Sequence, residues 1–453
     1  MSVSGPRQAW RLVPWLEGFL ALLVLVGIGY AAWYLVVRGY LPQPFFFDLD
    51  DSLIDGYSTA YYANNPGAYD VWKTVYPPLS FVLLKLVTLH RCYVADDYKL
   101  ARGCDWLLRA VLFGFFWLNV VLIHKAYRKR HGTPMWARTI AVGIGMPSLY
   151  ALDRGNLVIP CFTCFILAYG DLIRSPRLRA LAAAATINLK PYLLVMLLPT
   201  LVKRRWVRLE YALVATVLVF IASFAILGDG SPAQITRNIL AFADSFTDGV
   251  SSALSNFQYS TTFDPLLRLF KSNLPLLDYF SSRDLELWQA VISGAIKLGQ
   301  VGFALCCLAA LVRPKGLKWR RFAALTLSAL LSVSDTSGGY SLIFLVFLVM
   351  FEPPRGLLPI GLVLCAFLLC IPADWVITPV MQRTEPSYWT GRLVQTAPGV
   401  TIGDFARPAL VLLIQYGYVA LNLIDMLRVK RRVGVLSGAA DAAPALPLAD
   451  GLI

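Results

Sequence analysis

The chain has 453 residues, of which 57% are hydrophobic and only 15% are charged, which excludes a string of ordinary soluble domains. Its formal net charge is +14. The cations form short clusters between apolar stretches instead of a basic groove, which argues against nucleic acid as a partner. This alternation is typical of a polytopic membrane protein, whose cytoplasmic loops collect Lys and Arg.

The first apolar stretch, 15–37, is long enough to span a bilayer and follows a basic start. It is too long for a signal peptide and has no small-residue cleavage site, so we interpret it as a retained signal anchor. The next cationic cluster, at 125–130, is cytoplasmic if one span at 107–124 precedes it. Residues 39–105 then form an outer segment, in which 79–89 is predicted to be an interfacial helix opened by prolines.

Beyond this segment the alternation of apolar stretches and cations is regular. Asn188, Lys190 and Pro191 interrupt the stretch 180–202, which is too short for two crossings, so we predict two short, broken helices there. Such breaks at membrane depth are tolerated only where they are buried in protein or line a cavity. Full spans are predicted near 135–152, 157–173, 209–227, 287–311, 357–372 and 406–427, with two more that flank 334–341.

These segments predict an all-α polytopic membrane protein of about 12 spans, with a range of about 10 to 13, and outer loops that carry interfacial helices. Residues 1–432 would form a single transmembrane domain with outer segments at 39–105, 228–286 and 373–405. The Ala-rich tail 433–453 is predicted to be disordered and cytoplasmic. The protein is expected in the plasma (inner) membrane, with both termini in the cytoplasm.

Eight cysteines are present, and most of them lie in apolar stretches. Cys161 and Cys164 have CxxC spacing, but no second pair or nearby histidine completes a metal set, so we interpret them as packing residues. Cys92 and Cys104 both fall in the first outer segment, where an oxidising compartment would allow them to pair. The sequence leaves that pairing open.

The first outer segment opens with four carboxylates, Asp48, Asp50, Asp51 and Asp55. Asp51 and Asp55 are spaced i, i+4 and would share one face of a helix. Asp48 and Asp50 have the DxD spacing of some divalent-metal sites, but two carboxylates are a weak signal, and a metal is left open. The alternative interpretation of the whole run is a solvated acidic turn.

Three further polar groups fall at the outer or middle level of the predicted membrane, at 153–156, 188–192 and 334–340. Ionisable residues in apolar surroundings are functional candidates. Arg154 either pairs with Asp153 or serves as a ligand. Lys190, beside a broken helix, suits a phosphate or pyrophosphate group. Aromatic residues in the outer segment either anchor the chain at the interface or contact a sugar.

An ordered set of short motifs carries a family resemblance. The motifs are Ile54-Asp55-Gly56, Gly67, Tyr69, Tyr76-Pro77-Pro78-Leu79, Gly155-Asn156-Leu157, Leu189-Lys190-Pro191-Tyr192 and Ser337-Gly338-Gly339-Tyr340. In this order and placement the chain resembles the integral-membrane glycosyltransferases of the C superfold. It most closely resembles glycosyltransferase family 87, the polyprenyl-phosphate-mannose-dependent transferases. The chain departs from the family in its late outer turn, where Asp335 and Gly339 replace the usual histidines, which leaves the acceptor and the sugar open.

The resemblance implies an inverting glycosyltransferase that moves mannose or a related hexose or pentose from a polyprenyl-phosphate donor. The acceptor would be a lipid or polysaccharide of the cell envelope at the outer face, and no cofactor beyond the lipid-linked sugar is predicted. Asp55, or else Asp51, would be the general base, and Lys190 and Arg154 would bind the donor phosphate. The predicted substrate contacts are Tyr57, Tyr76, Asn156, Tyr192, Asp335 and Tyr340.

Two alternatives remain at this point. A transporter or a flippase of lipid-linked sugars would also use intramembrane charges, but would need a pathway that opens to each side in turn. A non-catalytic subunit of a polysaccharide assembly complex would need no base, and its acidic run would be a solvated turn. The long, aromatic-rich outer segments favour a site that faces outward.

Overall fold

The computed structural model describes residues 6–45, 48–94, 97–132, 135–245, 259–265, 281–334, 338–379 and 382–440. Within these ranges the protein is mostly helical, and five helices are long and apolar enough to cross a membrane. They are α1 (Pro6–Arg38), α5 (Trp106–His131), α11 (Trp206–Leu227), α15 (Ser282–Val312) and α19 (Ile402–Ala440). The mostly helical fold and the apolar helices are consistent with the predicted helical membrane protein.

The other apolar helices are shorter than the predicted spans. The span expected at 135–152 is divided into α6 (Trp136–Ile144) and α7 (Met146–Asp153) at Gly145. A Cβ on Gly145 would come within 2.8 Å of the Cβ of Cys370, so glycine permits this close approach. The others are α8 (Val158–Tyr169), α16 (Trp319–Leu331), α17 (Leu342–Val349) and α18 (Leu357–Leu368). None reaches the length of about 20 residues that a full crossing needs, so the count of about 12 spans stays a prediction.

The break predicted within 180–202 is confirmed. Helix α9 (Pro176–Leu189) ends before Lys190, whose φ of −137° is extended, and a 3₁₀ helix, η2 (Pro191–Leu197), leads into α10 (Leu198–Val202). The proline explains the break, because its ring disfavours the helical conformation in the residue before it. Lys190 therefore lies between two helical segments and is 93% buried, with a relative exposure of only 7%.

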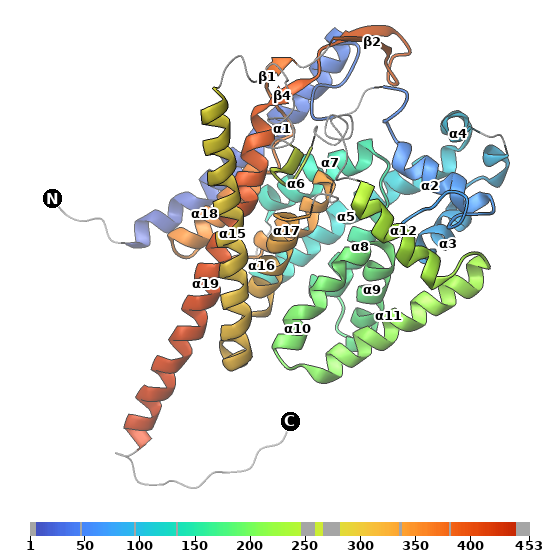
Figure 1. Ribbon diagram of the computed structural model, residues 1–453. Helices are drawn as coiled ribbons and strands as arrows, with labels where there is room; N and C mark the ends of the chain where they lie inside the picture. Colours follow the sequence, from blue (N-terminus) through green and yellow to red (C-terminus); the bar gives the residue numbers. More distant parts are fainter. Residues whose placement is uncertain are drawn as a thin grey trace.

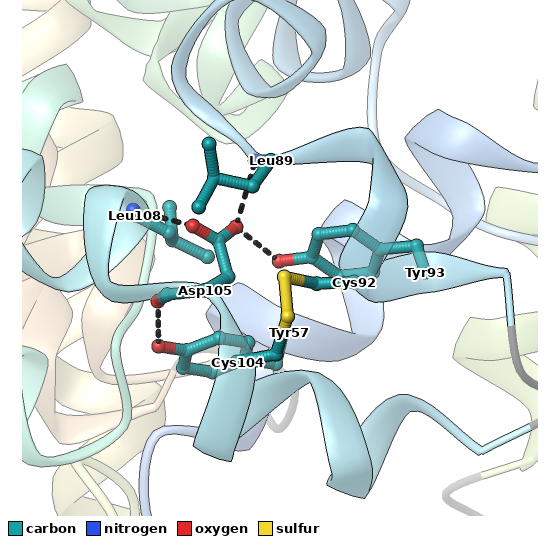
Figure 2. Close-up of a disulfide and its surroundings, with 7 residues drawn as sticks. All are labelled: Tyr57, Leu89, Cys92, Tyr93, Cys104, Asp105 and Leu108. Atoms are coloured by element: carbon teal, nitrogen blue, oxygen red, sulfur yellow. Dashed lines mark hydrogen bonds between the residues drawn. A yellow bond between two sulfur atoms is a disulfide. The ribbon is translucent and has the colours of Figure 1, made fainter.

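The first outer segment contains α2 (Ile54–Asn64), α3 (Pro78–Val87), a 3₁₀ helix η1 (His90–Tyr93) and α4 (Tyr98–Cys104). Helix α3 is the predicted interfacial helix, and it opens at the two prolines as expected. A disulfide between Cys92 and Cys104 joins η1 to α4 (Figure 2). The pairing that the sequence left open is therefore present.

Asp105 fastens this segment to the start of α5, as Figure 2 shows. Its carboxylate accepts the backbone N–H of Leu108 at 3.1 Å, which caps α5, and the hydroxyl of Tyr93 at 2.8 Å. Its backbone carbonyl accepts the hydroxyl of Tyr57 from α2 at 2.8 Å. Side-chain caps of this kind typically contribute about 1 kcal/mol. The outer segment is thus held on a rigid helix end.

The segment 373–405 corrects the purely α-helical prediction. It forms two nested antiparallel pairs, in which β1 (Val376–Pro379) pairs with β4 (Gly399–Thr401) and β2 (Arg383–Pro386) pairs with β3 (Leu393–Thr396). Runs of Val, Ile and Thr bounded by Pro and Gly favour strands, a signal too short to detect reliably in the sequence. Ser387 forms a β-bridge with Asp48, so this segment contacts the first outer segment.

Figure 1 shows the strands at one end of the molecule and the connection between α10 and α11 at the opposite end. Helix α17, whose eight residues are all buried, lies within the helical core between them. Of the second outer segment, α12 (Pro232–Ser245) is described, and η4 (Pro314–Gly316) and η5 (Gly339–Ser341) complete the elements. Helix α19 continues eight residues beyond the predicted start of the tail at 433, and 441–453 lie outside the described residues.

Candidate functional site

The predicted carboxylates meet Arg154 at the start of α2. One guanidinium nitrogen of Arg154 lies 2.7 Å from Asp51 Oδ1, and another lies 2.6 Å from Asp55 Oδ1. The amide of Asn156 donates to the second oxygen of Asp55 at 2.6 Å. Asp51 lies in the turn before α2 and Asp55 in the first turn of α2, and Arg154 bridges the two carboxylates.

The backbone around this cluster is packed closely. The N–H groups of Leu53 and Asp55 donate to the carbonyls of Asp153 and Arg154 at 2.7 and 3.0 Å. Gly155 adopts a φ of +61°, and a Cβ on Gly56 would lie 2.7 Å from its carbonyl oxygen. Leu53 also has a positive φ of 60°, which costs a non-glycine residue about 1–2 kcal/mol. Strain of this kind, where the surrounding structure maintains it, is common at functional sites.

Asn156 is held in place by its own helix. It is fully buried, and its side-chain oxygen accepts the backbone N–H of Val158 at 2.9 Å, at the start of α8. Because that bond fixes which end of the amide faces α8, the amide nitrogen is directed at Asp55. The resemblance implied a substrate contact for Asn156, and the structure gives it a carboxylate to orient.

Lys190 lies next to this cluster, under two tyrosine rings. Its ammonium nitrogen is 4.8 Å from the ring centroid of Tyr76 and 5.6 Å from that of Tyr340. Among the described residues, no carboxylate or carbonyl receives a hydrogen bond from it. A buried ammonium whose described close contacts are aromatic faces is costly, since each cation–π contact contributes about 0.5–2 kcal/mol and desolvation costs several kcal/mol.

Tyrosines connect Lys190 to the carboxylates. Tyr76 lies in hydrogen-bond contact with Thr59 on α2, and Tyr340 lies within electrostatic reach of Lys190, Asp55 and Arg154. Burial raises the pKa of Tyr76, and the Asp55 charge raises it further, so this phenol stays protonated and can donate a hydrogen bond. The Tyr192 hydroxyl lies 2.9 Å from that of Ser341.

One predicted substrate contact, Tyr57, does not fall in this cluster. Tyr57 is fully buried on the other face of α2, where it bonds to Asp105 (Figure 2). Two positions after Asp55 on a helix, it cannot share that residue's face. Asp335 lies outside the described residues. The structure therefore brings together Asp51, Asp55, Arg154, Asn156, Lys190, Tyr76, Tyr192 and Tyr340.

The DxD residues have other partners. Asp48 Oδ1 accepts the backbone N–H groups of Asp50 and Asp51 at 2.8 and 2.6 Å, and Asp50 forms an ion pair with Lys99. This geometry fits a solvated turn stabilised by its own side chains. Within the part of the chain that the structure describes, no group of three or more His, Cys, Asp and Glu could hold a metal ion.

Sequence reasoning missed a second buried network at the same end. Arg407 of α19 binds Asp374 and Asp404 at 2.6 and 2.7 Å and lies 4.7 Å from the ring centroid of Tyr259. Tyr259 in turn packs on Tyr150, whose ring lies 6.2 Å from that of Tyr340. The i, i+3 spacing of Asp404 and Arg407 at the start of an apolar helix was the available signal.

These features define a mostly helical protein with helices long and apolar enough to cross a membrane. An acidic and cationic cluster, partly buried, lies at the strand-bearing end of its core. Comparison of the chain with protein-family models, with curated proteins and with solved structures gave no match.

Proposed function

We propose that the protein is an inverting glycosyltransferase that uses a polyprenyl-phosphate sugar as donor. The observation that supports this proposal is the placement of a fixed carboxylate, Asp55, near a buried lysine that no described carboxylate neutralises. A lipid-linked sugar places its phosphate at the headgroup level, so its transferase needs a base above the interface and a cation at it. The motif resemblance to glycosyltransferase family 87 points to the same chemistry.

In the proposed reaction Asp55 accepts the proton of the acceptor hydroxyl while that oxygen attacks the anomeric carbon. The new carbon–oxygen bond forms as the bond to the donor phosphate breaks, and the lipid phosphate leaves with the electron pair. Displacement from the opposite side inverts the anomeric carbon. Both Asp55 oxygens already accept hydrogen bonds, but an ionised carboxylate has about four acceptor sites, which leaves room for the acceptor hydroxyl.

Asp55 is the better placed of the two candidate bases. Its side chain is 15% exposed, against 46% for Asp51, and it lies within electrostatic reach of Tyr76 and Tyr340. A base shielded from water works without competition from solvent protons. Asp51 would then share Arg154 with Asp55 and help to position it.

The two cations have different proposed roles. Lys190 would bind the phosphate as a point charge, because an incoming anion supplies the partner that it lacks. Charge grows on the phosphate as it leaves, so this contact would strengthen in the transition state. Arg154 is bound to both carboxylates, and we assign it chiefly to holding them, while its contact with the donor stays a prediction.

The proposal also places the protein in the inner membrane with both termini in the cytoplasm and about 12 crossings in a glycosyltransferase C-type bundle. The acceptor would be a lipid or glycan of the cell envelope. The prenyl chain is expected beside the broken helices near Lys190.

The test is sugar transfer by purified protein from a polyprenyl-phosphate-mannose donor, with the corresponding pentose donor in parallel. We expect Asp55→Asn to lose about 10²–10⁴-fold in rate, as removal of a general base does. Asp51→Asn, the matched variant four residues away, should lose much less. Full activity in both variants would overturn the proposal. Movement of the donor across vesicles without a new glycosidic bond would select the flippase instead.

A further inference from the structure

The end of the molecule opposite the carboxylate cluster contains a cavity of about 590 Å³. Its walls come from α8, α9, η2, α10 and α16, together with the start of α11. Figure 1 shows the α10–α11 connection at the end of the molecule opposite the strands. Five cationic side chains line it without a described partner: Arg130, Arg174, Lys203, Arg205 and Arg208.

The acidic residues of this cleft are already engaged. Asp171 forms ion pairs with Arg320 and Arg179, and Glu352 binds Arg321 at 2.8 Å. Within the described ranges no carboxylate pairs with the five cations named above. The cleft therefore has a large excess of positive charge that its own residues do not balance.

Three of these cations, Lys203, Arg205 and Arg208, lie close enough together for their charges to repel one another. Burial lowers the pKa of Lys203, and the charge of Arg205 lowers it further. Burial also lowers the pKa of Arg205, with contributions from Arg208 and Arg179. Both shifts have the sign expected of like charges brought together in a partly desolvated place, and a bound anion would relieve the repulsion.

The inner wall of the cleft is apolar. It includes small residues on the facing sides of α9 and α11, such as Ala180, Ala183 and Ala212, and the side chain of Leu197. Trp319 stacks on Tyr169 at a centroid distance of 5.3 Å. A cationic mouth above an apolar wall matches a molecule with a charged head and a hydrocarbon chain.

We propose that this cleft binds the phosphate group of an anionic membrane lipid. The preference for cytoplasmic Lys and Arg would place cations at one end of the protein, but it does not require the five unpaired ones to converge on one cavity from three separate segments. Free phosphate shares the same head chemistry, and the apolar wall favours the lipid. The inference is independent of the glycosyltransferase proposal, because it needs only a membrane-embedded protein.

The test uses the full chain in detergent, with native mass spectrometry of added phosphatidylglycerol, phosphatidylcholine and inorganic phosphate. We expect phosphatidylglycerol to bind and Arg205→Gln/Arg208→Gln to bind it at least about tenfold more weakly, because two charged contacts to the phosphate are lost. The control Arg313→Gln/Lys315→Gln removes the same charge from exposed positions outside the cleft and should bind like the wild type.

Equal loss of binding in both double variants would overturn the proposal, because it would mean that only overall charge matters. Inorganic phosphate binding as tightly as the lipid would overturn the lipid assignment. A second measurement needs no variant: phosphatidylglycerol should protect Lys203 from an amine-reactive reagent, and phosphatidylcholine should not. Equal labelling of Lys203 with either lipid would count against the site.

Discussion

The two ends of the molecule use their arginines in different ways. At the strand-bearing end, Arg154 and Arg407 are each bound by two carboxylates. Around the opposite cleft, the cations of the α10–α11 connection have no described acidic partner. A paired arginine mainly fixes its neighbours, whereas an unpaired one can bind an anion from outside. The number of arginines at each end does not distinguish these two roles. The partner of each arginine side chain does.

Lys190 is the exception at the strand-bearing end. It is buried like Arg407, yet it has aromatic rings where Arg407 has carboxylates. A cation kept in this state lowers stability unless a ligand supplies its counter-charge. Lys190 therefore differs from the nearby arginines, whose carboxylate partners indicate a structural role.

The largest expected effect is in cysteine labelling, which should be complete or absent at each position. This experiment tests whether the two ends of the molecule lie on opposite sides of the membrane. A cysteine at the exposed Pro66 should react with an impermeant maleimide from outside intact cells, and one at the exposed Arg177 only after permeabilisation. The wild-type chain, which has six free cysteines and five of these in helices, is the background control. The reverse pattern would invert the assignment of the ends.

Replacing Lys190 should separate activity from stability. We expect Lys190→Met to lose about 10²-fold or more in sugar transfer, because charge on the leaving phosphate is no longer balanced. The free energy of unfolding, measured by thermal unfolding, should stay the same or rise by about 1 kcal/mol. Burying an apolar side chain costs less free energy than burying an unpaired ammonium. Lys190→Arg, which keeps the charge, should retain part of the activity. A Met variant that is less stable but fully active would make Lys190 a structural residue.

A smaller effect is expected where α2 meets the loop after α7. In Gly56→Ala the added Cβ would lie 2.7 Å from the carbonyl oxygen of Gly155, which is itself packed against Leu53. We expect a loss of about 1–3 kcal/mol in unfolding free energy, with roughly tenfold slower transfer as Asp55 shifts.

The matched control for that variant is Gly103→Ala in α4, where no atom lies within 4 Å of the new Cβ. Alanine favours helix by up to about 1 kcal/mol over glycine, so this variant should be as stable as the wild type or slightly more so. If the two alanine variants behave alike in both assays, the close packing at Gly56 is not what holds the carboxylate.

Part of the site was predictable because local chemistry determines it. Pro191 forces the break that leaves Lys190 between helices, and the prolines at 77 and 78 open α3. The i, i+4 spacing made Asp51 and Asp55 candidates for one site, but Asp51 precedes α2, and only the structure shows that Arg154 joins the two carboxylates. That partner comes from about 100 residues away in the chain, and no local rule selects it.

The amino-acid sequence by itself determined the membrane class, the long apolar helices and the positions of the breaks, because hydropathy and proline act over a few residues. The tertiary structure decided which charges are paired, which tyrosines surround Lys190, and that Tyr57 faces Asp105 instead of the carboxylates. It also folded 373–405 into nested strands. These features depend on contacts between distant segments, whose free energies exist only once the chain is assembled.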